Sequence, residues 1–153
     1  MGREIRRVPL GWEHPRDERT GRYRPLFDKD YESAAREWIA ELIQWEAGTH
    51  KAQPDAFSIY YWEYAGNPPD EDYCRPKFDA EQTCYQIYET VSEGTPVSPV
   101  FESLDAMIAW LVNEGYSQTA AERFAQSGWA MSATFDTSTG RFASGIQTLD
   151  VGQ

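Results

Sequence analysis

The sequence lacks the features that build a disulfide framework or a membrane anchor. Only two cysteines occur, Cys74 and Cys84, and in a reducing compartment both are expected to be free thiols. No apolar run approaches the roughly 20 residues of a membrane span, and the first seven residues lack the apolar stretch of a secretory signal. These absences predict a soluble intracellular protein with no membrane partner.

Recognisable catalytic and cofactor motifs are missing too. There is no G-x-S-x-G nucleophile elbow and no glycine-rich phosphate loop. The potential zinc ligands lack the short paired spacing of structural zinc sites; they are His14, His50, Cys74 and Cys84. We therefore expect no enzymatic activity, no cofactor and no metal, and we interpret the two histidines as ordinary surface or helix-capping residues.

Positive charge is absent from a long stretch of the chain. Between Phe78 and Glu122 there is no Lys or Arg, but eight carboxylates occur: Asp79, Glu81, Glu89, Glu93, Glu102, Asp105, Glu114 and Glu122. Residues 1–30 carry eight Lys/Arg against six Asp/Glu, whereas residues 31–153 carry six against nineteen, within a net charge of −11. Such a surface repels nucleic acid and anionic membranes and attracts basic proteins.

The pattern of elements predicts an α+β fold, with a small antiparallel sheet packed against two or three helices. A helix is expected over residues 29–47, capped by Asp30, with a buried stripe of Tyr31, Ala34, Ala35, Trp38, Ile39 and Leu42. Further helices are expected after the caps Ser103 and Thr119. Strands are expected at residues 56–64 and 83–92, which we expect to pair, and a hairpin at residues 132–148.

The predicted organisation is an Arg/Pro-rich arm at residues 1–28, a single core domain at residues 29–131 and a C-terminal hairpin or tail at residues 132–153. Prolines at positions 9, 15 and 25 indicate an extended arm with at most one short strand. Its arginines either neutralise the acidic body internally or form an external anion site.

Two sets of candidate site residues follow from charge and aromatic content. The protein-binding candidates are the carboxylates between residues 70 and 114 with one tyrosine: Asp70, Glu71, Asp72, Tyr73, Glu89, Glu93, Glu102, Asp105 and Glu114. Aromatic surplus in the predicted strands can also stack on a ligand, with arginines over it. The alternative ligand-binding candidates are Tyr61, Trp62, Tyr85, Arg6 and Arg7.

Several strings in the sequence resemble a family of small acidic proteins encoded by bacteriophages and prophages. They are GREIRRVP with WEHP at residues 2–15, YYW and GNPP at residues 60–69, YQIYETVSEGTPVSP at residues 85–99, and residues 121–130. The residues from position 132 onward match nothing in that family. The resemblance implies no catalytic residue, because no activity is established for the family, but it implies a bacterial host cytoplasm and host machinery as a target.

The first hypothesis is a phage-encoded acidic protein that inhibits a host defence factor by occupying a basic, nucleic-acid-binding surface. Such a protein would be anti-CRISPR-like in the broad sense, a nucleic-acid mimic whose partner is a basic host protein or nucleoprotein effector and not nucleic acid itself. The alternative is a small-molecule or nucleotide-binding protein, a sponge or small enzyme, that uses the aromatic cluster and the N-terminal arginines. A virion or packaging component is a third possibility.

Overall fold

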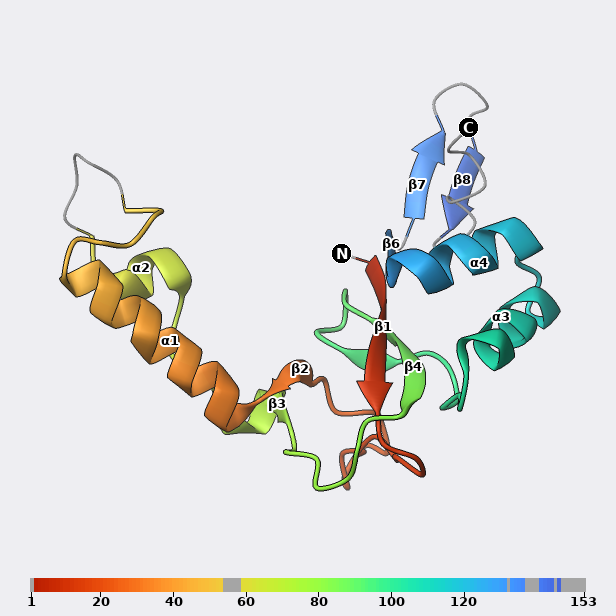
Figure 1. The fold of residues 1–153 in the computed structure, drawn as a ribbon, viewed down its shortest axis with the longest axis horizontal. Helices are drawn as coiled ribbons and strands as arrows, with labels where there is room; N and C mark the ends of the chain where they lie inside the picture. The colour runs from red at the N-terminus through yellow and green to blue at the C-terminus, as the bar shows by residue number, and fades with distance from the viewer. Residues whose placement is uncertain (1, 54–58, 132, 137–140, 145, 147–153) are drawn as a thin grey trace. The chain divides into compact units, whose positions relative to one another are not determined.

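The structure, a computed structural model, describes residues 2–53, 59–131, 133–136, 141–144 and 146. The chain divides into two compact units (Figure 1). The first unit joins Met1–Pro25 to Phe78–Gln153, and the second unit is Leu26–Lys77. The predicted boundaries at residues 28 and 131 do not coincide with these units, because the N-terminal segment pairs with strands that lie more than 75 residues later.

The first unit contains a four-stranded sheet with the strand order β5-β4-β1-β6. The strands are β1 (Gly2–Val8), β4 (Cys84–Glu89), β5 (Thr95–Pro96) and β6 (Trp129–Met131). All neighbouring pairs are antiparallel, and Ile5 lies opposite Ile87 at the centre of the β1–β4 register. The expected strand at residues 83–92 is therefore confirmed as β4.

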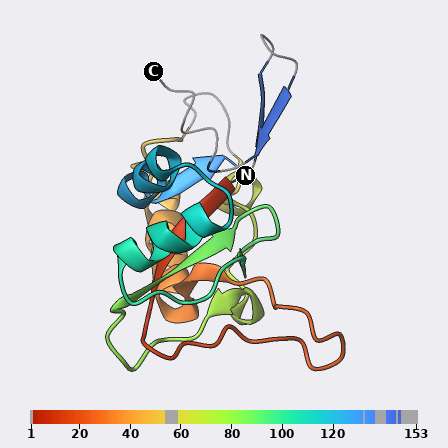
Figure 2. The same cartoon turned by 90° about the vertical axis from the view of Figure 1, so that its right-hand side faces the viewer.

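Two helices cover one face of this sheet, α3 (Leu104–Asn113) and α4 (Gln118–Ser127), as Figures 1 and 2 show. Their apolar faces meet Ile87 in the core, which includes Met107, Leu111 and Phe124. Each of these side chains is at most 1% exposed. The predicted α+β fold, with a small antiparallel sheet against helices, is confirmed.

The ends of these helices follow the local chemistry of the chain. Ser103 caps α3 as predicted, since its side chain accepts a hydrogen bond from the Ala106 amide. The cap of α4 is Ser117 and not the expected Thr119, because Ser117 reaches the Ala120 amide and begins the helix two residues earlier. Gly128 ends α4 in the left-handed conformation, with φ of 73°.

The segment predicted as an N-terminal arm contributes an interior strand. Strand β1 lies between β4 and β6: it pairs with β4 from Arg3 to Val8 and with β6 from Gly2 to Glu4. Gly2 allows the close approach of β6, because a Cβ at this position would lie 2.3 Å from the Ala130 carbonyl oxygen. The rest of the predicted arm, residues 9–25, carries an isolated bridge between Arg16 and Tyr23.

The second unit is built around helix α1 (Tyr31–Glu46), which confirms the expected helix at residues 29–47. Before it, β2 (Phe27–Asp30) pairs in parallel with β3 (Cys74–Arg75). The predicted buried stripe is only partly correct, because Tyr31 and Ile39 are 42% and 51% exposed. Trp45, at the other end of the helix, is buried instead, with its indole N–H donated to the Ile59 carbonyl.

The expected strand at residues 56–64 is wrong in its described part. Residues Tyr61–Ala65 form a short helix, α2, followed by a 3-10 turn, η1 (Glu71–Tyr73). At the start of α2 the Glu63 side chain accepts a hydrogen bond from the Tyr60 amide at 2.8 Å, a local contact that the aromatic content did not reveal. The expected pairing between this predicted strand and β4 is wrong as well, since β4 pairs with β1 and β5. Residues 56–58 lie outside the described residues.

The expected C-terminal hairpin is confirmed in its strands. Strand β7 (Ala133–Asp136) pairs antiparallel with β8 (Arg141–Ser144), and Phe135 lies opposite Phe142. Residues 137–140, which connect the two strands, lie outside the described residues. Among the helices in the described ranges, none has the length and apolar character needed to cross a membrane.

The N-terminal cap of α1 offers a test of stability against pH. Asp30 accepts a hydrogen bond from the Ser33 amide, and this bond holds the pKa of the Asp30 carboxyl below its usual value of 3.8. The stabilisation is therefore complete above pH 3.8 and is lost as the pH falls through the lowered pKa. We expect Asp30→Ala to reduce the free energy of unfolding by about 1 kcal/mol at pH 7 in urea denaturation.

The matched control for this cap is Asp30→Asn, which keeps an acceptor oxygen for the Ser33 amide but cannot titrate. Its stability at pH 7 should lie close to that of the unaltered chain. An alanine variant as stable as the asparagine variant would show that the cap does not stabilise α1.

Candidate functional site

The predicted protein-binding residues are divided between the two units. Asp70, Glu71, Asp72 and Tyr73 belong to the second unit, and the remaining five belong to the first. All of them are exposed except Glu89, which is half-buried. Within the first unit, Glu102 and Asp105 lie at the start of α3, Glu114 lies at its end, and Glu93 lies in the loop between β4 and β5.

Two of these carboxylates occupy positions where the local fold would favour another residue. Glu93 has φ of 62°, a left-handed conformation that is unfavourable for a residue with a Cβ. Glu114 caps the C-terminus of α3, where the helix dipole disfavours negative charge, and the last turn of that helix has no basic residue. The stability of the local backbone therefore does not explain why Glu93 and Glu114 occupy these positions.

The two acids at the start of α3 have a structural explanation. Asp105 lies in the first turn, and Glu102 directly precedes the cap Ser103, so the positive end of the helix dipole favours both charges. In the described part of the first unit, no arginine forms an ion pair with Glu93, Glu102, Asp105 or Glu114. The exposed end of α3 and the β4–β5 loop thus present uncompensated negative charge.

The N-terminal arginines make contacts within the first unit instead. Arg3 pairs with Glu89 at 3.1 Å and donates to the Tyr116 hydroxyl at 2.9 Å. Arg6 is buried and pairs with Glu4 at 2.8 Å. These contacts favour the alternative in which Arg3 and Arg6 neutralise carboxylates within the protein over the alternative in which they form an external anion site. Glu89, one of the predicted binding residues, is engaged in the same way.

The acidic turn of the second unit is partly explained by its own backbone. The Asp70 side chain caps η1 by accepting a hydrogen bond from the Asp72 amide. Glu71 and Tyr73 remain exposed, with Tyr73 at 44%. Between Leu26 and Lys77 the chain carries five Lys/Arg against eleven Asp/Glu, so this unit alone has a charge of −6.

The alternative ligand-binding residues form no common site within either unit. The Arg7 guanidinium stacks on the Tyr85 ring, 4.5 Å from its centre, which leaves no space for a ligand between them. Arg6 stacks in the same manner on Tyr88. Tyr61 and Trp62 belong to the second unit, where Tyr61 is buried.

Tyr61 is a core residue of the second unit. Its hydroxyl donates a 2.6 Å hydrogen bond to Glu41, and burial, followed by the effect of Glu41, raises the Tyr61 pKa to about 12. The ring lies among Trp45, His50 and Tyr64, with ring centres 5.9 to 6.3 Å away. These contacts explain Tyr61 and Tyr64 by packing, whereas Tyr60 and Trp62 are 66% and 53% exposed.

The interpretation of both histidines as surface or capping residues is wrong. His50 is 8% exposed within the aromatic core of the second unit, and His14 is 7% exposed in the first unit. His14 Nε2 lies 2.6 Å from the Arg24 carbonyl oxygen, and Nδ1 lies 2.9 Å from the Tyr88 hydroxyl. Burial, with Coulombic contributions from Arg6 and Arg24, lowers the His14 pKa below 6.5 despite the Arg24 hydrogen bond.

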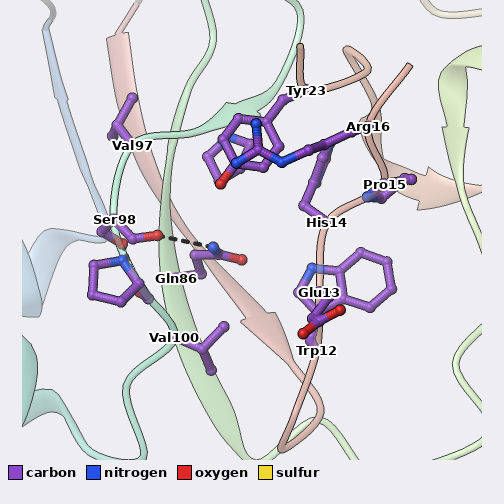
Figure 3. A pocket seen from close by; sticks show the side chains of 12 residues that line it. Trp12, Glu13, His14, Pro15, Arg16, Tyr23, Gln86, Val97, Ser98 and Val100 are labelled. Atoms are coloured by element: carbon purple, nitrogen blue, oxygen red, sulfur yellow. Dashed lines mark hydrogen bonds between the residues drawn. The ribbon is translucent and has the colours of Figure 1, made fainter. Parts of the chain in front are cut away.

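A pocket of about 960 Å³ lies beside His14 in the first unit. Figure 3 shows residues 12–16 with Tyr23 on one side, residues 97–100 on the other, and Gln86 between them. Gln86 is 6% exposed and donates its amide to the Ser98 carbonyl at 2.9 Å. Strand β4 is buried on both faces, and no sequence signal marked Gln86 as a pocket residue.

The cysteines are free thiols, as predicted, and both are buried. Burial and the neighbouring Asp30, Asp70 and Glu71 raise the pKa of the Cys74 thiol, which disfavours a reactive thiolate. Across the residues described by the structure, no cluster of three or more His, Cys, Asp or Glu side chains is arranged to hold a metal ion.

Comparison with family models, with curated proteins and with solved structures finds no match to this chain.

Proposed function

We propose that this chain is a non-catalytic binding protein that occupies a basic, nucleic-acid-binding surface of a partner protein and thereby inhibits it. The observation that carries this proposal is the placement of Glu93 and Glu114. Both are exposed, neither is ion-paired among the described residues, and each occupies a backbone position that disfavours it. A side chain kept against the local preference of its backbone suggests a role outside the fold.

Charge segregation supports the same function. Arg3 and Arg6 are paired inside the first unit, so the acids around α3 keep their field toward solvent. Exposed carboxylates accelerate association with a basic surface and disfavour acidic partners. The resemblance to phage-encoded proteins supports a bacterial defence factor, such as an RNA-guided nucleoprotein, as the partner.

The proposal is tested by affinity purification of the tagged chain from prophage-bearing bacterial cells, followed by mass spectrometry. We expect a partner with a basic nucleic-acid-binding channel, eluted as salt rises from about 0.15 M toward 1 M, because the screening length falls from about 8 Å to about 3 Å. Added oligonucleotide should compete with this chain for the partner. A partner without a basic surface, or one retained equally at both salt concentrations, would contradict the proposal.

A further inference from the structure

The hydrogen-bond network around His14 is one proton short when the imidazole is neutral. The Arg24 carbonyl can only accept, so the proton of neutral His14 must lie on Nε2, which is 2.6 Å from that oxygen. Nδ1 is then an acceptor that faces the Tyr88 hydroxyl at 2.9 Å. The only proton that this hydroxyl can donate is therefore needed at Nδ1.

Gln86 competes for the same proton. Its amide nitrogen must face the Ser98 carbonyl, which fixes the orientation of the side chain and places Oε1 3.1 Å from the Tyr88 hydroxyl oxygen. Trp12 donates its indole N–H to the Tyr88 hydroxyl oxygen at 3.1 Å, so this N–H does not reach Gln86 Oε1. Whichever acceptor takes the hydroxyl proton, the other one lacks a donor.

Protonation of His14 would complete the network, but the surroundings oppose it. Burial disfavours a further positive charge on His14. Arg6 from β1 and Arg24 from the loop that follows β1 disfavour it as well. Among the described residues, the other titratable groups in contact with His14 are Tyr88 from β4 and Tyr23, whose ring centre lies 5.6 Å from that of His14. His14 therefore stays neutral at pH 7, and the imidazole nitrogen, the more basic acceptor, holds the Tyr88 proton.

The missing donor can come from the pocket, because Gln86 lines it. Oε1 offers an acceptor there, and Nε2 has a second hydrogen besides the one given to Ser98. This pair is complementary to a planar edge that carries an N–H donor beside an acceptor, which is the pattern by which glutamine recognises adenine. The walls suit a flat ring, since Trp12 and the prolines at positions 96 and 99 present apolar surfaces.

We propose that this pocket binds a neutral heterocyclic base or nucleoside through a donor and acceptor edge that pairs with the Gln86 amide. The net charge of −11 favours an uncharged ligand over a polynucleotide or a nucleoside triphosphate. When His14 is protonated, the Tyr88 proton returns to Gln86 Oε1, so a ligand donor then meets an acceptor with one free lone pair instead of two. Binding is therefore linked to the loss of a proton from His14.

Calorimetric titration with adenosine tests the site, with caffeine as a planar control that has no N–H donor. We expect adenosine to bind at pH 7.5 at least about tenfold more tightly than caffeine, as one buried hydrogen bond would give. Adenosine affinity should fall as the pH is lowered through the His14 pKa, which burial holds below 6.5. Titration with adenosine monophosphate and with a single-stranded oligoadenylate tests whether the ligand is a nucleoside, a nucleotide or a polynucleotide. Both should bind more weakly than adenosine.

Two variants separate the site from the network. Gln86→Leu should weaken adenosine binding at least about tenfold, with its fold checked by thermal denaturation. Tyr88→Phe removes the shared proton, so adenosine should still bind but its affinity should no longer fall as His14 becomes protonated. Equal binding of adenosine and caffeine to the unaltered chain would overturn the proposal without any variant, as would absence of binding at millimolar adenosine. A Tyr88→Phe variant with unchanged pH dependence would overturn the proton linkage.

Discussion

Exchange of three exposed carboxylates of the first unit for lysine, Glu93, Glu102 and Glu114, should weaken binding to a basic partner by at least about a hundredfold. Juxtaposed like charges at an interface cost several kcal/mol, and each 1.4 kcal/mol corresponds to a factor of ten. The effect should diminish as salt rises, because these side chains are exposed. Surface plasmon resonance against the captured partner at two salt concentrations measures both quantities.

The same residues allow binding to be separated from folding. Glu114→Lys places a cation at the C-terminus of α3, which should raise the free energy of unfolding by about 0.3–1 kcal/mol. Glu93→Gly removes a side chain from the left-handed conformation and should stabilise the chain by about 1 kcal/mol. Each single variant should thus be more stable but bind less well. If either variant binds as tightly as the unaltered chain, that carboxylate has no role in recognition.

Arg19→Glu is a suitable control for non-specific charge effects. Arg19 is exposed in the loop before Gly21, and the exchange lowers the total charge of the chain by two. Binding to a basic partner through the α3 acids should be unchanged or slightly stronger in this variant. Weaker binding would place the loop, and not the acids, at the interface.

Phe124→Ala should remove about 3–5 kcal/mol from the free energy of unfolding, the range for deletion of a fully buried aromatic ring. Phe124 is 0% exposed and lies in the core between α4, α3 and the sheet. The surrounding Met107 and Leu111 are themselves at most 1% exposed, so they have little freedom to refill the space. The melting temperature should fall by roughly 10 °C in a calorimetric scan.

The control for this variant is Gln126→Ala, an exposed position on the same helix with a residue of good helix propensity. Its stability should change by less than about 0.5 kcal/mol. A Phe124→Ala variant with the stability of this control would contradict the packing of α4 on the sheet.

Local pattern predicted those elements whose signals lie within a few residues of one another. The stripe from residue 104 to residue 112 and the cap Ser103 specified α3, and Asp30 specified the start of α1. Alternation specified β4, and paired aromatics around a turn specified β7 and β8. These elements depend on short-range backbone hydrogen bonds and side-chain periodicity, which a sequence records directly.

Pairing between distant segments was decided by tertiary structure. The partner of β4 is β1, from the opposite end of the chain, and not the aromatic segment before it, which forms α2. Position 2 requires glycine because the β6 carbonyl passes within 2.3 Å of where a Cβ would be. No local signal could indicate either fact, because both depend on which surfaces meet after the chain has folded.

The sequence by itself determined the charge of this protein, its free cysteines and the types of most of its elements. Only the tertiary structure decided which charges remain uncompensated, since Arg3 and Glu89 are 86 residues apart and yet form an ion pair. It also placed His14 and Gln86, two residues without any motif, in one network beside a pocket. Composition fixes how many charges and hydrogen-bonding groups a chain has, but their partners depend on long-range packing.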